Sequence, residues 1–121
     1  MGKTILVIDD STSLRQVVRM SLEGAGYNVL EAGDGMAALA LLDGRQIHMA
    51  ICDVNMPKLD GISFVKQAKQ LPAYRFLPVL MLTTESSEEK KQAGKAAGAK
   101  AWMLKPFAPS SMLAAVSKFC A

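Results

Sequence analysis

Five polar residues that could bind a metal ion or a phosphate stand directly after short apolar runs of this sequence. They are Asp9, Asp10, Asp53, Thr83 and Lys105. If these residues meet in a partly dry cleft, their three carboxylates repel one another and call for a cation. Oxygen ligands favour Mg²⁺, which typically takes one or two carboxylates and keeps several waters. With Lys105 beside it, such a cation leaves a position for an anionic phosphoryl group.

The apolar runs indicate which elements position these residues. Short runs at residues 5–8, 29–30, 49–52, 79–82 and 101–104 predict buried strands. Between and after them, apolar residues recur every three or four positions and predict helices around 14–25, 38–42, 62–68 and 112–116. Residues 86–97 suit an exposed helix capped by Ser86 or Ser87.

The alternation of these elements predicts an α/β fold of the (βα)₅ type, doubly wound around a five-stranded parallel sheet. A parallel sheet is buried on both faces, as strands of continuous apolar residues require. The flavodoxin-like strand order 2-1-3-4-5 is taken from known doubly wound folds. The carboxyl ends of the strands then bring the polar residues to one edge. At 121 residues we expect one domain, residues 1–121, without a linker.

The motifs at the strand ends resemble the receiver domain family of two-component response regulators over essentially the whole chain. They are Asp9-Asp10-Ser11, Asp53-Val54-Asn55-Met56-Pro57 continuing to Asp60-Gly61, Thr83-Thr84 and Lys105-Pro106-Phe107. One dipeptide would carry no weight, whereas four blocks in order at four strand ends are highly specific. The length of the chain and residues 98–102 look most like the chemotaxis (CheY-like) branch.

The resemblance implies that Asp53 is the nucleophile that accepts a phosphoryl group, with Mg²⁺ bound beside it. Asp10 and Asp53 would supply carboxylate ligands, and Asp9 would act directly or through water. Asn55 would contribute its backbone carbonyl to the metal.

The resemblance also implies how the phosphoryl group is held and sensed. Thr83 would bond one phosphoryl oxygen and Lys105 another, with a cis Lys105-Pro106 bond that aims the ammonium inward. Trp102 occupies the position of a switching aromatic, usually Tyr or Phe in this family. Movement of Thr83 would let Trp102 repack.

The implied activity is that of a cytoplasmic signalling phosphoprotein with self-phosphorylation and autodephosphorylation, rather than an enzyme with its own substrate. The phosphodonor would be a histidine kinase, and a phosphatase is a further implied partner. No output domain is expected after Ala121, so the signal would leave through the fourth helix, fifth strand and fifth helix. This surface is expected to carry Lys90, Lys91, Lys95, Lys100 and Lys118. Its target would be a flagellar-motor switch component or another regulatory protein.

Three other functions remain open from the sequence. A phosphate sink that drains a kinase would have the same site. A receiver-shaped scaffold that works without phosphorylation predicts a missing acid, Thr or Lys, and none is missing. An aspartyl-phosphate phosphatase of the haloacid-dehalogenase type would resemble Asp-x-Asp after the first strand, whereas Asp53-Val54-Asn55 follows the third and lacks the second acid.

Composition argues against several other classes. The net charge is +3, but the 14 Lys and Arg share the chain with 11 acids and form no Arg-rich run, so nucleic-acid binding is not expected. No apolar run approaches the roughly 20 residues that span a bilayer, so membrane attachment is not expected. Cys52 and Cys120 are expected to be reduced thiols, and His48 an exposed loop residue.

Overall fold

Strands and helices alternate along residues 2–56, 58–84 and 88–120, the residues that the computed structural model describes. The strands are β1 (Thr4–Ile8), β2 (Asn28–Ala32), β3 (Met49–Asp53), β4 (Val79–Thr83) and β5 (Ala101–Leu104). The helices are α1 (Thr12–Gly24), α2 (Gly35–Leu41), α3 (Gly61–Gln70), α4 (Glu88–Ala97) and α5 (Pro109–Phe119), with a 3₁₀ turn η1 (Pro72–Tyr74). The predicted (βα)₅ arrangement is confirmed.

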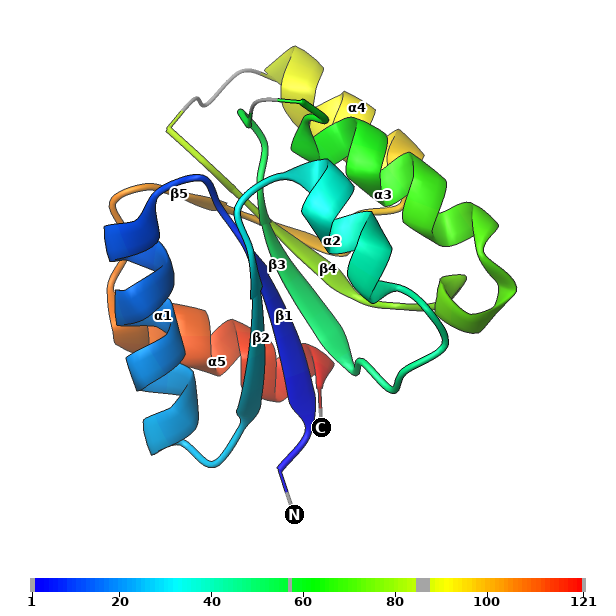
Figure 1. The fold of residues 1–121 in the computed structure, drawn as a ribbon. Coiled ribbons are helices and arrows are strands. Elements are labelled where there is room, and N and C mark those ends of the chain that lie inside the picture. The colour runs from blue at the N-terminus through cyan, green and yellow to red at the C-terminus, as the bar shows by residue number, and fades with distance from the viewer. Residues whose placement is uncertain (1, 57, 85–87, 121) are drawn as a thin grey trace.

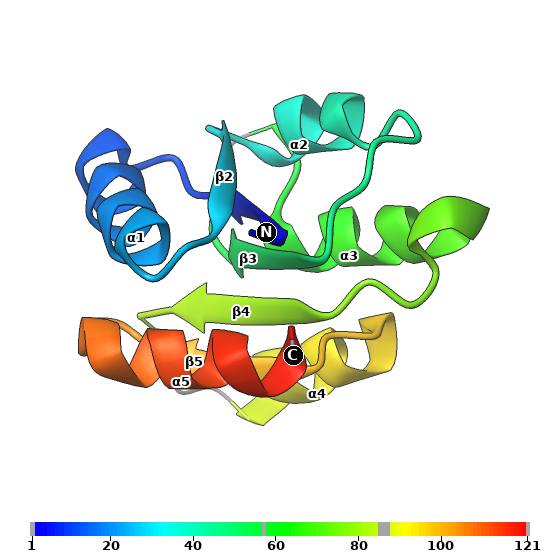
Figure 2. The same ribbon diagram turned by 90° about the horizontal axis from the view of Figure 1, so that it is seen from below.

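The five strands form one parallel sheet in the order β2-β1-β3-β4-β5. Helices α1 and α5 cover one face, and α2, α3 and α4 cover the other (Figures 1 and 2). The strand order reverses at β1, where the chain first moves outward to β2 and then crosses to β3. The predicted flavodoxin-like topology is therefore confirmed, and the carboxyl edge beside this reversal is where ligands of such sheets bind.

Burial on both faces explains why the strands are continuously apolar. Every residue of β3 and β4 is buried. Alternate side chains enter two cores. One lies under α2, α3 and α4 and includes Phe64 and Met81, and the other lies under α1 and α5 and includes Leu22 and Met112. These two cores fix the strands whose ends carry the candidate site.

Local hydrogen bonds define where the helices start. The side chains of Ser11, Asp34 and Asp60 cap α1, α2 and α3 by accepting a backbone N–H three residues further on, at 2.8–3.2 Å. The caps predicted at Ser86 and Ser87 lie outside the described residues. After α1, α2 and α4 the chain turns at Gly26, Gly44 and Gly98, each with positive φ, which only glycine adopts readily.

Two features differ from the sequence-based expectations. Strand β2 is longer than the predicted 29–30, because an edge strand tolerates polar residues such as Asn28 and Glu31 while its backbone still pairs with β1. His48 was expected in an exposed loop, and that prediction was wrong. Its ring is partly buried, with Nδ1 accepting the backbone N–H of Thr4 at 2.9 Å, because the chain before β3 already lies beside β1.

Among the described residues, no helix is long and apolar enough to cross a lipid bilayer. Both cysteines are buried and unbonded to each other.

Candidate functional site

Three carboxylates from two strands meet at the carboxyl edge of the sheet. Asp9 and Asp10 follow β1 and Asp53 ends β3, and one carboxylate oxygen of each lies within 4.8 Å of the others. Asp9 is 1% exposed and Asp53 6%, whereas Asp10 is open to solvent. A hard divalent cation could be shared by these oxygens and be reached from solvent on the Asp10 side. The residues present therefore fit Mg²⁺.

Lys105 enters the same cluster from the end of β5, 96 residues away from Asp9 in the sequence. Its Nζ lies 2.7 Å from Asp9 Oδ2 and 3.4 Å from Asp53 Oδ1. Burial alone would lower the pKa of Lys105, but the hydrogen bond to Asp9 and the charges of Asp9 and Asp53 raise it. Lys105 is thus held as a cation, and its bond to Pro106 is cis.

The surroundings of Asp53 disfavour the charged form of its carboxyl. Burial and the neighbouring charge of Asp9 raise the pKa of its carboxyl, against the opposing effects of Lys105 and of the backbone hydrogen bond from Asn55. The adjacent thiol of Cys52 is wholly buried, and that burial raises its pKa well above the ordinary value. The thiol is therefore inaccessible and disfavoured as a thiolate, which leaves Asp53 as the candidate nucleophile at this strand end.

An arginine network holds the loop that carries Asp9. The Arg15 guanidinium donates to the backbone carbonyl of Asp9 at 2.5 Å and to Glu31 Oε1 at 3.0 Å. Arg19 donates to the other oxygen of Glu31 at 2.6 Å, and the backbone N–H of Ser11 donates to Asp9 Oδ1 at 2.9 Å. Arg15 and Glu31 were not predicted from the sequence, because nothing in their spacing shows that a residue of β2 faces one of α1.

Gly61 allows the end of β3 to lie against α3. Its N–H donates to the carbonyl of Val54 at 2.9 Å, and Val54 N–H donates to Leu82 of β4 at 3.0 Å. A Cβ at Gly61 would lie 2.1 Å from the backbone oxygen of Asp53. The glycine is therefore required for close approach of two backbones.

Thr83 and Asn55 lie beside this cluster. Thr83 ends β4 next to Asp53 and is 0% exposed, and its carbonyl accepts the backbone N–H of Lys105 at 2.7 Å. Asn55 is exposed in the loop after β3. Pro57 of the same motif lies outside the described residues.

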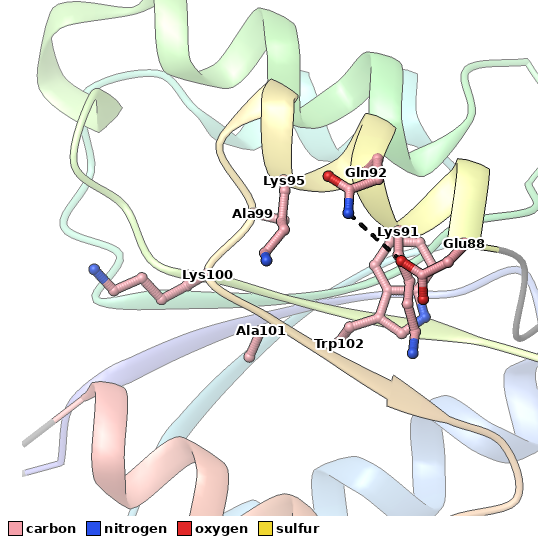
Figure 3. A pocket seen from close by; sticks show the side chains of 8 residues that line it. All are labelled: Glu88, Lys91, Gln92, Lys95, Ala99, Lys100, Ala101 and Trp102. Carbon is pink, nitrogen blue, oxygen red and sulfur yellow. Dashed lines mark hydrogen bonds between the residues drawn. The ribbon is translucent and has the colours of Figure 1, made fainter.

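Trp102 does not belong to the carboxylate cluster. It lies on β5 opposite Met81, and its ring packs against α4, where a Cβ at Gly94 would come within 2.6 Å of it. The side chain lies beneath Lys91 at a hollow of about 300 Å³ between α4 and β5 (Figure 3). Its indole Nε1 is buried, and no hydrogen-bond partner is found for it among the described residues. Trp102 could respond to the site through the sheet and α4.

Comparison with known families identifies this arrangement. Residues 5–117 match the family described as response regulator receiver domain. The chain belongs to that family. A receiver domain is a signalling module of a two-component system, uses Mg²⁺, takes its phosphoryl group from a histidine kinase and acts on downstream regulatory targets.

Solved and curated relatives of this receiver domain come from more than one branch. The chemotaxis protein CheY4 of Vibrio cholerae superposes with a TM-score of 0.94 at 45% sequence identity, covering 98% of this chain and 99% of that one. The alkaline phosphatase synthesis transcriptional regulatory protein PhoP of Bacillus subtilis is 40% identical over 116 residues, 96% of this chain and 48% of the relative. The phosphate regulon transcriptional regulatory protein PhoB of Pseudomonas aeruginosa is 33% identical over 114 residues, 94% of this chain and 50% of the relative. The receiver domain thus spans about half the length of these two transcriptional regulators.

Replacing Asp10 with alanine is expected to weaken Mg²⁺ binding by roughly tenfold or more, because one of the three oxygen donors is lost. Isothermal calorimetry of the receiver domain with MgCl₂ measures this directly. The Asp43→Ala variant is the matched control, because Asp43 pairs with Arg45 in a different loop. Equal affinities of Asp10→Ala and Asp43→Ala would remove Asp10 from the metal site.

As the pH is lowered, Mg²⁺ affinity is expected to begin falling at a higher pH than it would at a site built from ordinary carboxylates. Protons compete with the metal for Asp53, and the raised pKa of this group means that protonation begins above the roughly pH 4 of a free aspartate. In the metal-free protein the raised pKa of Asp53 makes folding stability, rather than metal affinity, depend on pH. The stability contributed by protonated Asp53 is present at low pH and is lost as the pH rises through that raised pKa. Calorimetric titrations from neutral pH downward test the first effect. An affinity that stays flat until an ordinary aspartate titrates would contradict it.

Proposed function

We propose that this receiver domain is the phosphoacceptor of a chemotaxis-type two-component system, with Asp53 as the phosphorylated residue. The observation that carries the proposal is the convergence of Asp9, Asp10 and Asp53 within 4.8 Å at one strand edge, with Lys105 bonded to Asp9 and near Asp53. The high similarity to CheY4 of Vibrio cholerae supports the chemotaxis branch.

The proposed reaction is an in-line displacement at phosphorus. A carboxylate oxygen of Asp53 forms a bond to the phosphorus of a phosphohistidine, and the bond from phosphorus to the imidazole nitrogen breaks as the imidazole leaves. Lys105 pairs with one equatorial oxygen, and the Thr83 hydroxyl donates a hydrogen bond to another. Mg²⁺, held by Asp10, Asp53, the carbonyl of Asn55 and Asp9 directly or through water, supplies further neutralisation of the phosphoryl charge.

The proposed output runs from Thr83 to the surface of α4 and β5. In the register of β4 and β5, Thr83 pairs with Leu104 and Met81 pairs with Trp102. A displacement of Thr83 would therefore be transmitted to the strand that carries the indole. Trp102 faces the hollow lined by Lys91 and Lys95 (Figure 3). An acidic or amphipathic segment of a flagellar-motor switch component, or of another regulatory partner, would suit this hollow. The side chain of Lys90, also assigned to this face, lies outside the described residues.

We further propose that residues 1–121 form a single receiver domain that works in the cytoplasm, where a kinase and a phosphatase would reach it. The overlap with CheY4, 98% of this chain and 99% of that one, supports one receiver domain over these residues. The second candidate is the receiver part of a transcriptional regulator, which the matches to half of PhoP and half of PhoB favour. A phosphate sink would share the Asp53 chemistry but not the output surface.

Nuclear magnetic resonance of the receiver domain with Mg²⁺ and the acyl-phosphate mimic beryllofluoride tests the output. We expect shifts at Thr83, Trp102 and along α4 and β5, and tighter binding of a motor-switch partner in the mimic-bound state. Changes confined to α1, with Trp102 silent, would refute this output surface. Shifts at Trp102 without a gain in affinity for any regulatory partner would favour the phosphate sink.

A further inference from the structure

The charges of the receiver domain are divided unevenly between two parts of the chain. Basic residues occur throughout, but residues 61–84 and 90–120 contain nine Lys and Arg and no Asp or Glu. These two stretches build α3, β4, β5 and α5 and most of α4. The acids gather in the remaining segments, including the carboxylate cluster. The half of the molecule around β4 and β5 is therefore basic, and such a field attracts anionic partners.

A hollow of about 320 Å³ lies in this basic half, at the amino-terminal ends of β4 and β5. It is at the opposite end of these strands from Asp53. We call it the basic pole and define it by Lys69, Arg75, Phe76, Lys100 and Phe119, which line it together with Pro78 and Gly98. Among the described residues that line it, none is acidic. The basic pole is thus a recess lined by three cations and by the apolar residues Phe76, Pro78 and Phe119.

The basic pole also carries an exposed aromatic side chain, Phe76. Its side chain is 87% exposed, more than the other large apolar residues of the described chain. Phe119 and Pro78 line the same hollow. Aromatic and arginine side chains next to each other on a surface are typical anchors of protein interfaces, with an apolar centre and a polar rim.

The stabilising effect of a helix dipole on a nearby cation explains only one of the three basic residues of the basic pole. Lys69 stands in the last turn of α3, where a cation is stabilised by the helix dipole. Arg75 and Lys100 stand outside the α-helices, so this effect does not explain them. Lys100 lines both the basic pole and the α4–β5 hollow, and Figure 3 shows its side chain extending away from Trp102 and Lys91.

The cations of the basic pole repel one another. The ammonium of Lys69 donates to the carbonyl of Leu77, which fixes it at the rim. Burial and the charge of Lys100 both lower the pKa of Lys69. An anion placed between Lys69 and Lys100 would relieve this repulsion.

We propose that the basic pole binds an acidic segment of a partner protein, whose carboxylates pair with Lys69, Arg75 and Lys100 and whose apolar side chain covers Phe76. The exposed ring favours a protein segment over a free inorganic anion, because the anion brings no apolar group to bury it. The lack of an Arg-rich run argues against nucleic acid. This surface lies at the opposite strand ends from Asp53. It shares Lys100 with the α4–β5 hollow, and none of its other lining residues lines that hollow. The inference does not rest on the function proposed above.

The test is a titration of the ¹⁵N-labelled full chain with a short synthetic peptide of Asp and Glu around a central Leu-Phe pair. We expect the shifts to centre on Arg75, Phe76 and Lys100, and the affinity to fall as salt is added. The Phe76→Ala variant and the double variant Arg75→Glu with Lys100→Glu should each weaken binding by about fivefold or more. Lys66→Glu is the matched control, because Lys66 is an exposed residue of α3 that does not line the hollow.

Several results would overturn the proposal. One is peptide binding that is equal in Phe76→Ala and Lys66→Glu. Another is a set of shifts centred on Lys91 and Lys95 instead of the basic pole. Equal or tighter binding of a single-stranded oligonucleotide, of inorganic phosphate or of the same peptide with Ser in place of Leu-Phe would likewise contradict it. A spectrum of ¹⁵N-labelled Phe76→Ala that matches the wild type outside the basic pole shows that the variant is folded, whichever outcome is found.

Discussion

Replacing Asp53 with asparagine is expected to reduce phosphorylation by at least about hundredfold, because an amide is a poor nucleophile and cannot form the acyl phosphate. The variant should keep its fold. Asp53 is buried beside Asp9 and its pKa is raised, so removing its charge relieves an unfavourable interaction in the metal-free protein. The rate of phosphoryl incorporation from a small phosphodonor in Mg²⁺ measures the loss, and thermal unfolding confirms the fold.

The matched control is Asp43→Asn. Asp43 forms an exposed ion pair with Arg45 that lowers its pKa to about 2, and it lies outside the carboxylate cluster. Its substitution should leave the phosphorylation rate unchanged. If Asp53→Asn incorporated phosphate on another residue at a comparable rate, the assignment of Asp53 would fail.

Replacing Gly61 with alanine is expected to have the largest effect on stability among the glycine substitutions near the site. The new Cβ would lie 2.1 Å from the Asp53 carbonyl and 3.0 Å from the Val54 Cα, both of them backbone atoms. The end of β3 must therefore move, at a cost of about 1–3 kcal/mol in the free energy of unfolding. Because Asp53 moves with it, Mg²⁺ binding and phosphorylation should weaken as well. Urea unfolding and calorimetry measure the two effects.

The Gly24→Ala variant separates this clash from the general effect of removing a glycine. Gly24 ends α1, and outside its chain neighbours and the backbone of its own helix no described atom lies within 4 Å of where its Cβ would be. Alanine there should stabilise the protein by about 0.5–1 kcal/mol. A Gly61→Ala variant as stable as Gly24→Ala would contradict the close approach of α3 to β3.

The fold could be predicted from the sequence because its strands are buried on both faces. Continuous apolar runs such as 49–52 and 79–82 have few alternatives to central parallel strands, and Gly26, Gly44 and Gly98 mark the helix ends. The strand order came from analogy with known doubly wound folds. Once the order is given, Asp9 and Lys105 are placed at the same edge of the sheet. Because β3 and β4 lie between their strands, the contact between the two side chains does not follow from the order alone.

Contacts between helix and sheet side chains could not be predicted in the same way. Arg15 bonds to Asp9 and Glu31 because α1 crosses β2 at a particular angle, which no local pattern records. His48 was misplaced for a related reason, since its partner Thr4 is 44 residues away. The basic pole was also missed. Lys and Arg are spread along the chain, and only the folded arrangement shows that the stretches without acids lie together.

The most direct test of Asp53 as the phosphoacceptor is mass spectrometry of the wild-type chain after incubation with Mg²⁺ and a small phosphodonor. The account predicts one added phosphoryl group per chain, found on the peptide that contains Asp53 and lost when Mg²⁺ is chelated before the reaction. A phosphoryl group located on any other residue, or incorporation that proceeds equally well without Mg²⁺, would contradict it.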